Sequence, residues 1–311
     1  MQTLADTLVN AFPFLYSKAE FQKPENKKII LQALGTLAST GHALPVRSGE
    51  ALIGAEPLIQ AASFNMKSQL DDAIRLYGLG EYDSAQSKVH SAIQNCFACH
   101  AAHQIGPRFP TTNNEIMGLA TPNILGKAVV FGSLRQFEGA LELIDKEGAR
   151  AINKKSLTSD NLVKLYLVIS LRSQQKFARA TTFLNRFNDG KISGTLAKWF
   201  NDIKSWQTLT AAGNRGPIAD YIAKRKKSDT AMKDDSLFVV YLLESYFLHN
   251  LPAPATSSAE AKATAFQQLA EDYAGLKFSP FETLPATYYR ACANAAPEST
   301  ISKQCLKLAG N

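Results

Sequence analysis

The chain has 311 residues, of which 45% are hydrophobic and 20% are charged, and this composition excludes a disordered or low-complexity protein. At about 150 residues per domain, the length favours two domains. The 34 Lys and Arg residues exceed the 27 Asp and Glu residues, which gives a formal net charge of +7. Because this surplus is mild and spread along the chain, it indicates acidic docking partners rather than nucleic acid.

The sequence shows neither a membrane-spanning segment nor a signal peptide. The longest uninterrupted apolar run, Leu237 to Leu243, is far shorter than a membrane span. The first six residues, Met1 to Asp6, have neither the basic start nor the apolar stretch of a signal peptide. We therefore expect either a cytosolic protein or a mature chain with an added start Met.

Apolar residues recur at spacings of three and four, and alternation over the length of a strand is scarce, so we predict an all-α protein. Pro24 and Pro57 suit the first turns of their helices. The segment 78–80, Gly-Leu-Gly, separates two amphipathic helices, which we expect to form an antiparallel hairpin. The predicted helices are 3–13, 25–42, 57–77, 81–103, 114–133, 136–147, 159–173, 176–187, 193–209, 216–226, 235–249, 258–275, 284–294 and 299–308.

The clearest helix breakers lie between residues 107 and 114, where two prolines precede Thr-Thr-Asn-Asn. We place a domain boundary there, between domains 1–110 and 115–311. In the second domain, residues 135–140 align with residues 175–180 at an offset of 40, with an aromatic residue followed three positions later by Ala in both segments. This pattern predicts a tetratricopeptide-like helical-hairpin solenoid, although chance similarity of two amphipathic helices remains an alternative.

The most informative motif is Cys96-Phe97-Ala98-Cys99-His100. A C-x-x-C-H string is typical of c-type haem attachment. Two thiols about one helical turn apart can form thioethers with the two vinyl groups of one porphyrin, and the adjacent His then binds the iron as its proximal ligand. We therefore predict one covalently attached haem c, held by Cys96, Cys99 and His100.

Three other chemistries use similar residues. A thioredoxin-like redox site would need a βαβ pattern beside the cysteines, and none is visible. A zinc site would need two further ligands, and only His100 and His103 lie near in sequence. A disulfide between Cys96 and Cys99 is possible, but it leaves the adjacent His unexplained.

The region up to the motif also resembles known haem proteins. The hairpin resembles the last two helices of cytochrome c′-type four-helix bundles, and the first 105 residues or so resemble periplasmic bacterial cytochromes with an appended helical-repeat domain. This resemblance implies a secreted electron carrier or haem-binding protein. The segments that carry it are Phe12-Pro13-Phe14-Leu15, residues 26–30, His42, Leu70-x-x-Ala73, Gly80-Glu81-Tyr82-x-x-Ala85 and the C-x-x-C-H motif.

The second axial position of the iron has several candidate ligands. His42, at the end of a predicted helix, would make a bis-His haem of low potential. Alternatively, it is a solvated residue whose charge suits the helix dipole. Met66, which the hairpin places opposite Ile93 and about two turns from His100, would raise the potential, or is core filler. His103 lies on the same helix face as His100 and cannot swing to the opposite side of the ring, so we do not expect it to be the ligand. An open site, as in many cytochrome c′ proteins, is the remaining possibility.

Cys292 and Cys305 lie in two short predicted helices that flank Pro297. If those helices pack antiparallel, their thiols come within bridging distance, so we predict a disulfide, with two buried thiols as the alternative. The hairpin also resembles the C-terminal caps of periplasmic helical-repeat proteins. A disulfide and a c-type haem both need an oxidising compartment, which favours a mature periplasmic protein.

No phosphate-binding loop, catalytic triad or paired-carboxylate motif is recognisable, so we expect an electron carrier and not an enzyme. Trp199 and Trp206 belong to the core of the solenoid or line a groove for a partner. The basic run 224–227 is a solvated helix end or docks an acidic redox partner. We predict a periplasmic monohaem c-type cytochrome. The alternatives are a haem-based sensor of a small gas and an assembly scaffold with a structural haem.

Overall fold

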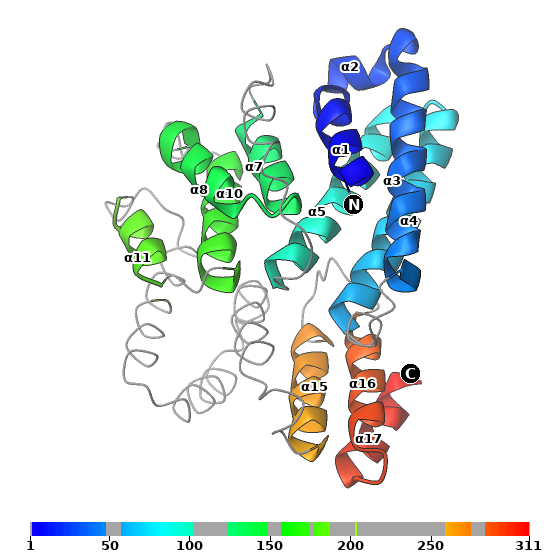
Figure 1. Cartoon of the computed structure of the whole chain (residues 1–311), viewed down its shortest axis with the longest axis vertical. Helices are drawn as coiled ribbons and strands as arrows, with labels where there is room; N and C mark the ends of the chain where they lie inside the picture. Colours follow the sequence, from blue (N-terminus) through cyan, green and yellow to red (C-terminus); the bar gives the residue numbers. More distant parts are fainter. Residues whose placement is uncertain are drawn as a thin grey trace.

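A computed structural model describes residues 2–47, 57–102, 123–148, 157–173, 177–186, 203, 259–274 and 284–310. Every regular element in these segments is helical, which confirms the all-α fold class. The helices form two connected groups in Figure 1, one built from the N-terminal and C-terminal segments and one built from the middle of the chain. None of the helices in the described segments is both long and apolar enough to cross a membrane.

The N-terminal segment agrees closely with the predicted helices. One short helix was not predicted: α2 begins after Ser17, whose side chain accepts a hydrogen bond from the backbone N–H of Glu20. The third helix also runs five residues beyond its predicted end at residue 42. The elements are α1 (Gln2–Leu15), α2 (Lys18–Gln22), the 3-10 turn η1 (Pro24–Asn26), α3 (Lys27–Arg47), α4 (Pro57–Gly78) and α5 (Tyr82–Ala102).

The predicted hairpin is formed by α4 and α5, which lie side by side along most of their length (Figure 1). Two residues after the end of α4, Gly80 has a left-handed backbone with φ of 81°. The N–H of Glu81 bonds to the carbonyl of Leu76 at 3.0 Å, and the N–H of Gly80 bonds to that of Tyr77 at 3.2 Å. These two bonds are the Schellman arrangement, and glycine is favoured at its left-handed position because it has no Cβ.

The middle of the chain contains two further helix pairs, although the predicted continuous helix over 114–133 is interrupted at Asn123. Asn123 is not helical, and its side chain caps α7 by accepting from the N–H of Gly126 at 2.8 Å. The elements are α7 (Ile124–Ser133), α8 (Phe137–Leu143), the π-helical turn η2 (Ile144–Gly148), α10 (Leu157–Val168), the π-helical turn η3 (Ile169–Ser173) and α11 (Phe177–Asn185).

The two aligned segments of the faint repeat both open helices, namely α8 and α11, and both of their alanines, Ala140 and Ala180, are fully buried. Arg179 of α11 forms an ion pair with Glu138 of α8, and Arg186, just after α11, forms one with Asp145 of η2. A tetratricopeptide-like solenoid over 115–311 stays a prediction, because much of that range lies outside the described residues.

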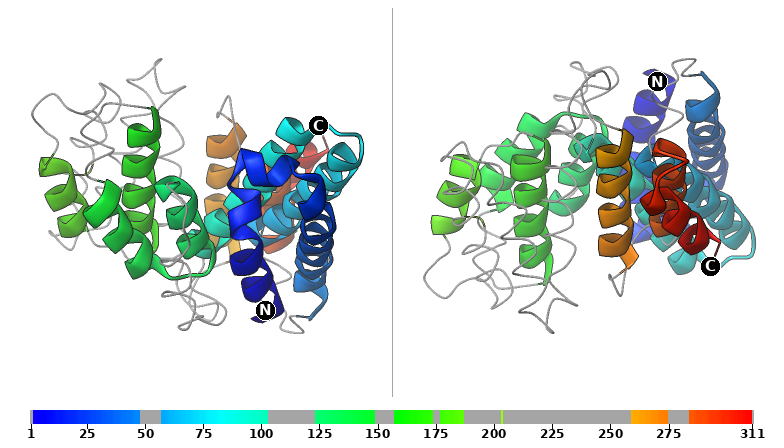
Figure 2. Two further views of the ribbon diagram at one scale, coloured as in Figure 1. Left: turned by 90° about the horizontal axis from the view of Figure 1, so that it is seen from above. Right: turned by 90° about the horizontal axis from the view of Figure 1, so that it is seen from below.

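One continuous hydrophobic core joins the N-terminal helices to α7, α8, α10 and α11, and a second, smaller core lies among the C-terminal helices. These helices are α15 (Ala259–Ala274), α16 (Leu284–Ala295) and α17 (Thr300–Ala309). Helix α16 packs against α4, and Ala61 and Ala62 of α4 belong to the second core. Figure 2 shows the C-terminal helices, coloured orange to red, beside the blue N-terminal segment.

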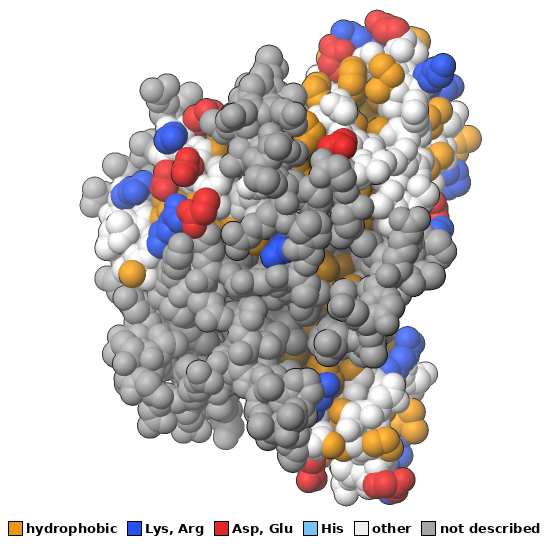
Figure 3. Space-filling model, viewed as in Figure 1, with side chains coloured by type: hydrophobic (Ala, Val, Ile, Leu, Met, Phe, Trp, Pro, Cys, Tyr) orange, Lys and Arg blue, Asp and Glu red, His pale blue; other side chains and the backbone are white. Residues whose placement is uncertain are grey.

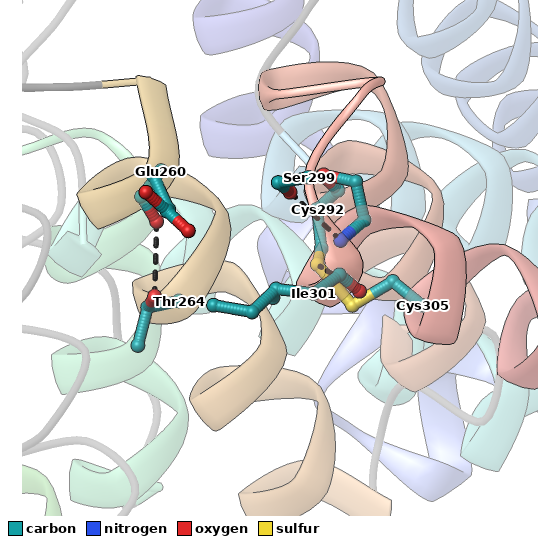
Figure 4. Close-up of a disulfide and its surroundings, with 7 residues drawn as sticks. Glu260, Thr264, Cys292, Ser299, Ile301 and Cys305 are labelled. Carbon is teal, nitrogen blue, oxygen red and sulfur yellow. Dashed lines mark hydrogen bonds between the residues drawn. A yellow bond between two sulfur atoms is a disulfide. The ribbon is translucent and has the colours of Figure 1, made fainter.

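The expected disulfide joins α16 and α17. Cys292 and Cys305 are bonded, with Cα atoms 6.0 Å apart, and both are fully buried (Figure 4). Ser299 begins α17 by accepting from the N–H of Ser302, whose hydroxyl donates to the carbonyl of Cys292 at 2.8 Å. The bond therefore closes a hairpin whose turn is also capped by side chains.

Several predictions fall outside the described residues. These are the helices 193–209 (except residue 203), 216–226 and 235–249, the boundary at 110–115, Trp199 and Trp206, and the basic run 224–227. On the face of the molecule in Figure 3, basic and acidic side chains of the described segments are interspersed rather than separated.

Candidate functional site

The C-x-x-C-H motif occupies the last turns of α5, where this helix lies between the two hydrophobic cores. Cys96 packs against the first core and Cys99 packs against the second. No disulfide joins these two thiols. The i and i+3 positions of a helix are neighbours on its surface, so the two thiols lie on one side of α5 while facing different groups of helices.

Cys96 contacts the hairpin partner through its sulfur. Its Sγ lies 3.3 Å from the Sδ of Met66, which is almost fully buried. Burial raises the pKa of the Cys96 thiol to about 12, and the neighbouring Cys99 adds to this effect. Met66 is thus one turn nearer to His100 than the expected position opposite Ile93.

A small cavity of about 10 Å³ lies next to this sulfur contact. Its lining comes from α1, α3, α4, α5 and α7 and is apolar except for Ser133. Its volume is at the lower limit for a single water molecule. The lining residues are Leu4, Leu8, Leu37, Met66, Leu70, Ala92, Ile93, Cys96 and Ser133.

His100 is held from the opposite side, by the end of α7. Its Nδ1 lies 2.6 Å from the backbone carbonyl oxygen of Ser133. A carbonyl oxygen only accepts, so Nδ1 carries the proton and donates. In the neutral ring, the lone pair is then on Nε2.

The surroundings of His100 favour this neutral ring. Burial is the main cause that lowers its pKa, to about 4, and the positive charge of Arg135 lowers it further, while the bond to the Ser133 carbonyl acts in the opposite direction. At neutral pH His100 therefore offers an unprotonated Nε2, as an imidazole needs for binding a metal.

The end of α7 is fixed on α5 by two further contacts. The first is from the Ser133 hydroxyl, which can donate to the carbonyl oxygen of Ile93 in α5 at 3.1 Å. The same hydroxyl also lies 2.9 Å from the carbonyl oxygen of Val129 in its own helix. A Cβ placed on Gly132 would overlap the ring of Phe97, so glycine permits the close approach of the two helices. This packing positions the Ser133 carbonyl against His100.

The other histidines contribute less to this arrangement. His42 lies in α3, but its side chain is outside the described residues, and so is the whole of His103. His90 is a packing residue. It stacks on Tyr16 with ring centroids 4.4 Å apart, and its Nε2 lies 2.9 Å from the carbonyl of Leu15.

Two residues of the site were missed by the sequence analysis, namely Ser133 and Arg135. Both lie more than thirty positions after the motif, and neither belongs to a pattern associated with haem. The only available signal was Gly132, because a glycine inside a helical pattern often indicates close packing.

In the described segments, no group of three or more His, Cys, Asp or Glu side chains is arranged to hold a metal ion. No family model matches the chain, and the comparisons with curated proteins and with solved structures found no similar protein.

Proposed function

We propose that the protein is a monohaem c-type cytochrome that carries single electrons, with Cys96 and Cys99 as the thioether residues and His100 as the proximal iron ligand. The observation that carries this proposal is the state of His100. The half-buried ring has a pKa lowered to about 4, which favours its neutral form, and it is held through Nδ1, which leaves the lone pair of Nε2 for a metal.

The donor set fits the group in its chemistry. A metal-binding histidine usually donates its other N–H to a carbonyl or carboxylate, which fixes the tautomer and the orientation of the ring. The Ser133 carbonyl supplies this acceptor. Two thiols at positions i and i+3, followed directly by such a histidine, would supply the two thioether sulfurs and the proximal ligand.

The space beside the motif is too small for a porphyrin in the packed structure. The cavity next to Cys96 holds no more than a water molecule, so a porphyrin needs more room there than the packed helices leave. The lining comes from five separate helices, and its side chains are apolar except for Ser133. Haem attachment would therefore move side chains of α1, α3 and α4 apart on the Cys96 side.

When bound, haem supplies one-electron redox chemistry, and the protein controls potential and access. In this chain, the Ser133 carbonyl would orient His100, and the bond would increase the basicity of the ring. Gly132 and Phe97 would hold α7 at the distance that this bond requires.

The proposed location is the periplasm, with an acidic redox partner that docks through the second domain. The Cys292–Cys305 disulfide supports an oxidising compartment. The net charge of +7 supports an acidic partner.

The test is the intact mass and visible spectrum of protein matured in a bacterial periplasm that contains the c-type haem attachment system. We expect wild type to gain the mass of one haem. The variants C96A and C99A should each lack the normal two-thioether product, because one of the two attachment sulfurs is gone. The double variant C292A/C305A is the matched control, and it should still carry haem. A bare wild-type polypeptide contradicts the proposal.

The apolar cavity favours a second candidate, a binder of a small uncharged gas, because its lining offers no charged side chain near Cys96. Carbon monoxide separates the two functions. Electron transfer with two axial ligands predicts a reduced spectrum that CO leaves unchanged, and gas binding predicts a shift. The variants M66L and H42A then identify the second ligand, because only loss of the true ligand converts the iron to high spin.

A further inference from the structure

The sulfur atoms of Cys96 and Met66 form a close pair inside the first core. Cys96 belongs to α5 and Met66 to α4, and their Sγ and Sδ atoms lie 3.3 Å apart. Met66 is almost fully buried, and Cys96 is partly buried against the same core. Two soft donor atoms from neighbouring helices therefore face each other, and this pair is separate from the pairing of Cys96 with Cys99 along the motif.

The space beside the two sulfurs has the size of a single ion. Both side chains line the cavity of about 10 Å³, which is close to the space of one water molecule. Metal–sulfur bonds are about 2.3 Å long, so two sulfurs up to about 4.6 Å apart can bind the same ion. The 3.3 Å between Sγ and Sδ is within this limit. One ion can therefore contact both sulfurs without the opening of the helices that a porphyrin would need.

The chemistry of the pair favours a soft ion of single charge. Thiolate and thioether sulfurs select Cu(I), whereas structural zinc needs four ligands. The side chains that line the cavity include no acidic or basic group. One Cys96 thiolate balances the single positive charge of Cu(I), so the complex is neutral. A divalent ion would leave a net charge in apolar surroundings, which costs free energy.

We propose that Cys96 and Met66 form a binding site for one Cu(I) ion in the chain without haem. A bond forms between copper and the Cys96 sulfur, the S–H bond breaks, and its proton goes to solvent. Met66 adds a lone pair of its sulfur, and no atom changes oxidation state. This inference goes beyond the proposed function and does not rest on it. A Cys96 sulfur that is bonded to haem lacks the thiol that copper needs, so the two uses belong to different forms of the protein.

The test is a competition, without oxygen, between the full-length haem-free protein and the coloured Cu(I) chelator bicinchoninate. We expect wild type to take up one equivalent of Cu(I). The variants M66L and C96A should bind it at least about tenfold more weakly, because even a partner outside the ligand set contributes that much to metal affinity. Leucine conserves the volume of methionine, and circular dichroism confirms that each variant is helical.

The matched control is C99A. Cys99 packs against the second core and is not among the residues that line the cavity, so C99A should bind Cu(I) as wild type does. Haem attachment follows the opposite pattern, because it needs Cys99 and does not need Met66. Equal Cu(I) affinity of M66L and wild type, or C99A as weak as C96A, overturns this inference alone. Wild type that takes no Cu(I) from the chelator also overturns it, whereas wild type without haem overturns only the proposed function.

Discussion

At the scale of single residues, the site depends on a glycine as well as on the side chains around it. Gly132 brings α7 against the Phe97 ring, and this approach places the Ser133 carbonyl on His100. Gly35, in the middle of α3, has nothing within 4 Å of the place where a Cβ would stand. A side chain at Gly132 would therefore collide with Phe97, whereas a side chain at Gly35 would meet open space.

We predict that G132A destabilises the protein by about 1–3 kcal/mol, because the added methyl group overlaps a ring that is packed between helices. G35A should instead stabilise it by up to about 1 kcal/mol, since alanine favours a helix over glycine. Urea unfolding of the three proteins measures both effects. Equal stability of G132A and wild type would contradict the close contact with Phe97.

At the scale of elements, α5 is held on both sides by hydrogen bonds to the ends of other helices. On one side, His100 bonds to the last residue of α7. On the other side, Gln86 Nε2 and His90 Nε2 both lie 2.9 Å from the carbonyl of Leu15, the last residue of α1. Carbonyls at a helix end lack partners within their own helix, so these side chains satisfy an otherwise unbonded group.

The packing of His90 predicts a pH dependence. Burial lowers its pKa below the ordinary value, while the bond to Leu15 acts in the opposite direction. The unfolded chain therefore binds more protons than the folded one below about pH 6.5. The contribution of neutral His90 is complete above that pH and is lost as the pH falls towards the folded pKa.

We expect the loss of unfolding free energy between pH 7.5 and pH 5.5 to be smaller in H90Q than in wild type, as measured by urea unfolding at each pH. Every other titrating group, including His100, is common to both proteins, so its effect cancels in the comparison. Identical losses in the two proteins would show that His90 titrates normally.

At the scale of the whole molecule, the C-terminal helices pack against α4 of the N-terminal segment. The C-terminal helices share their core with Ala61 and Ala62, and Cys99 packs against the same core. The Cys292–Cys305 disulfide lies within it. The candidate haem site is therefore bordered by a segment almost two hundred residues away in sequence.

We predict that C292A/C305A lowers the unfolding free energy by about 3 kcal/mol, the chain-entropy value for closing a loop of this short length. Because the core is shared, amide hydrogen exchange should accelerate in the first half of α4 as well as in α15–α17. Exchange in α8 and α11 should stay unchanged. Faster exchange confined to α16 and α17 would contradict the shared core.

The sequence by itself determined the features that depend on neighbouring residues. Apolar spacing located the described helices to within a few residues, and Gly78-Leu79-Gly80 located the hairpin turn, because both signals lie within one or two helical turns. The exceptions, α2 and the start of α7, depended on capping by Ser17 and Asn123. The pairing of Cys292 with Cys305 followed from two adjacent helices.

Only the tertiary structure decided which residues surround the motif. Cys96 meets Met66, Cys99 meets the C-terminal core, and His100 meets Ser133. Each contact joins helices that are separate in sequence, and the packing of whole apolar faces sets their relative position. The spacing of residues along the chain does not determine that packing. Ser133 and Arg135 therefore become candidates for the site only through the packing of α7 on α5.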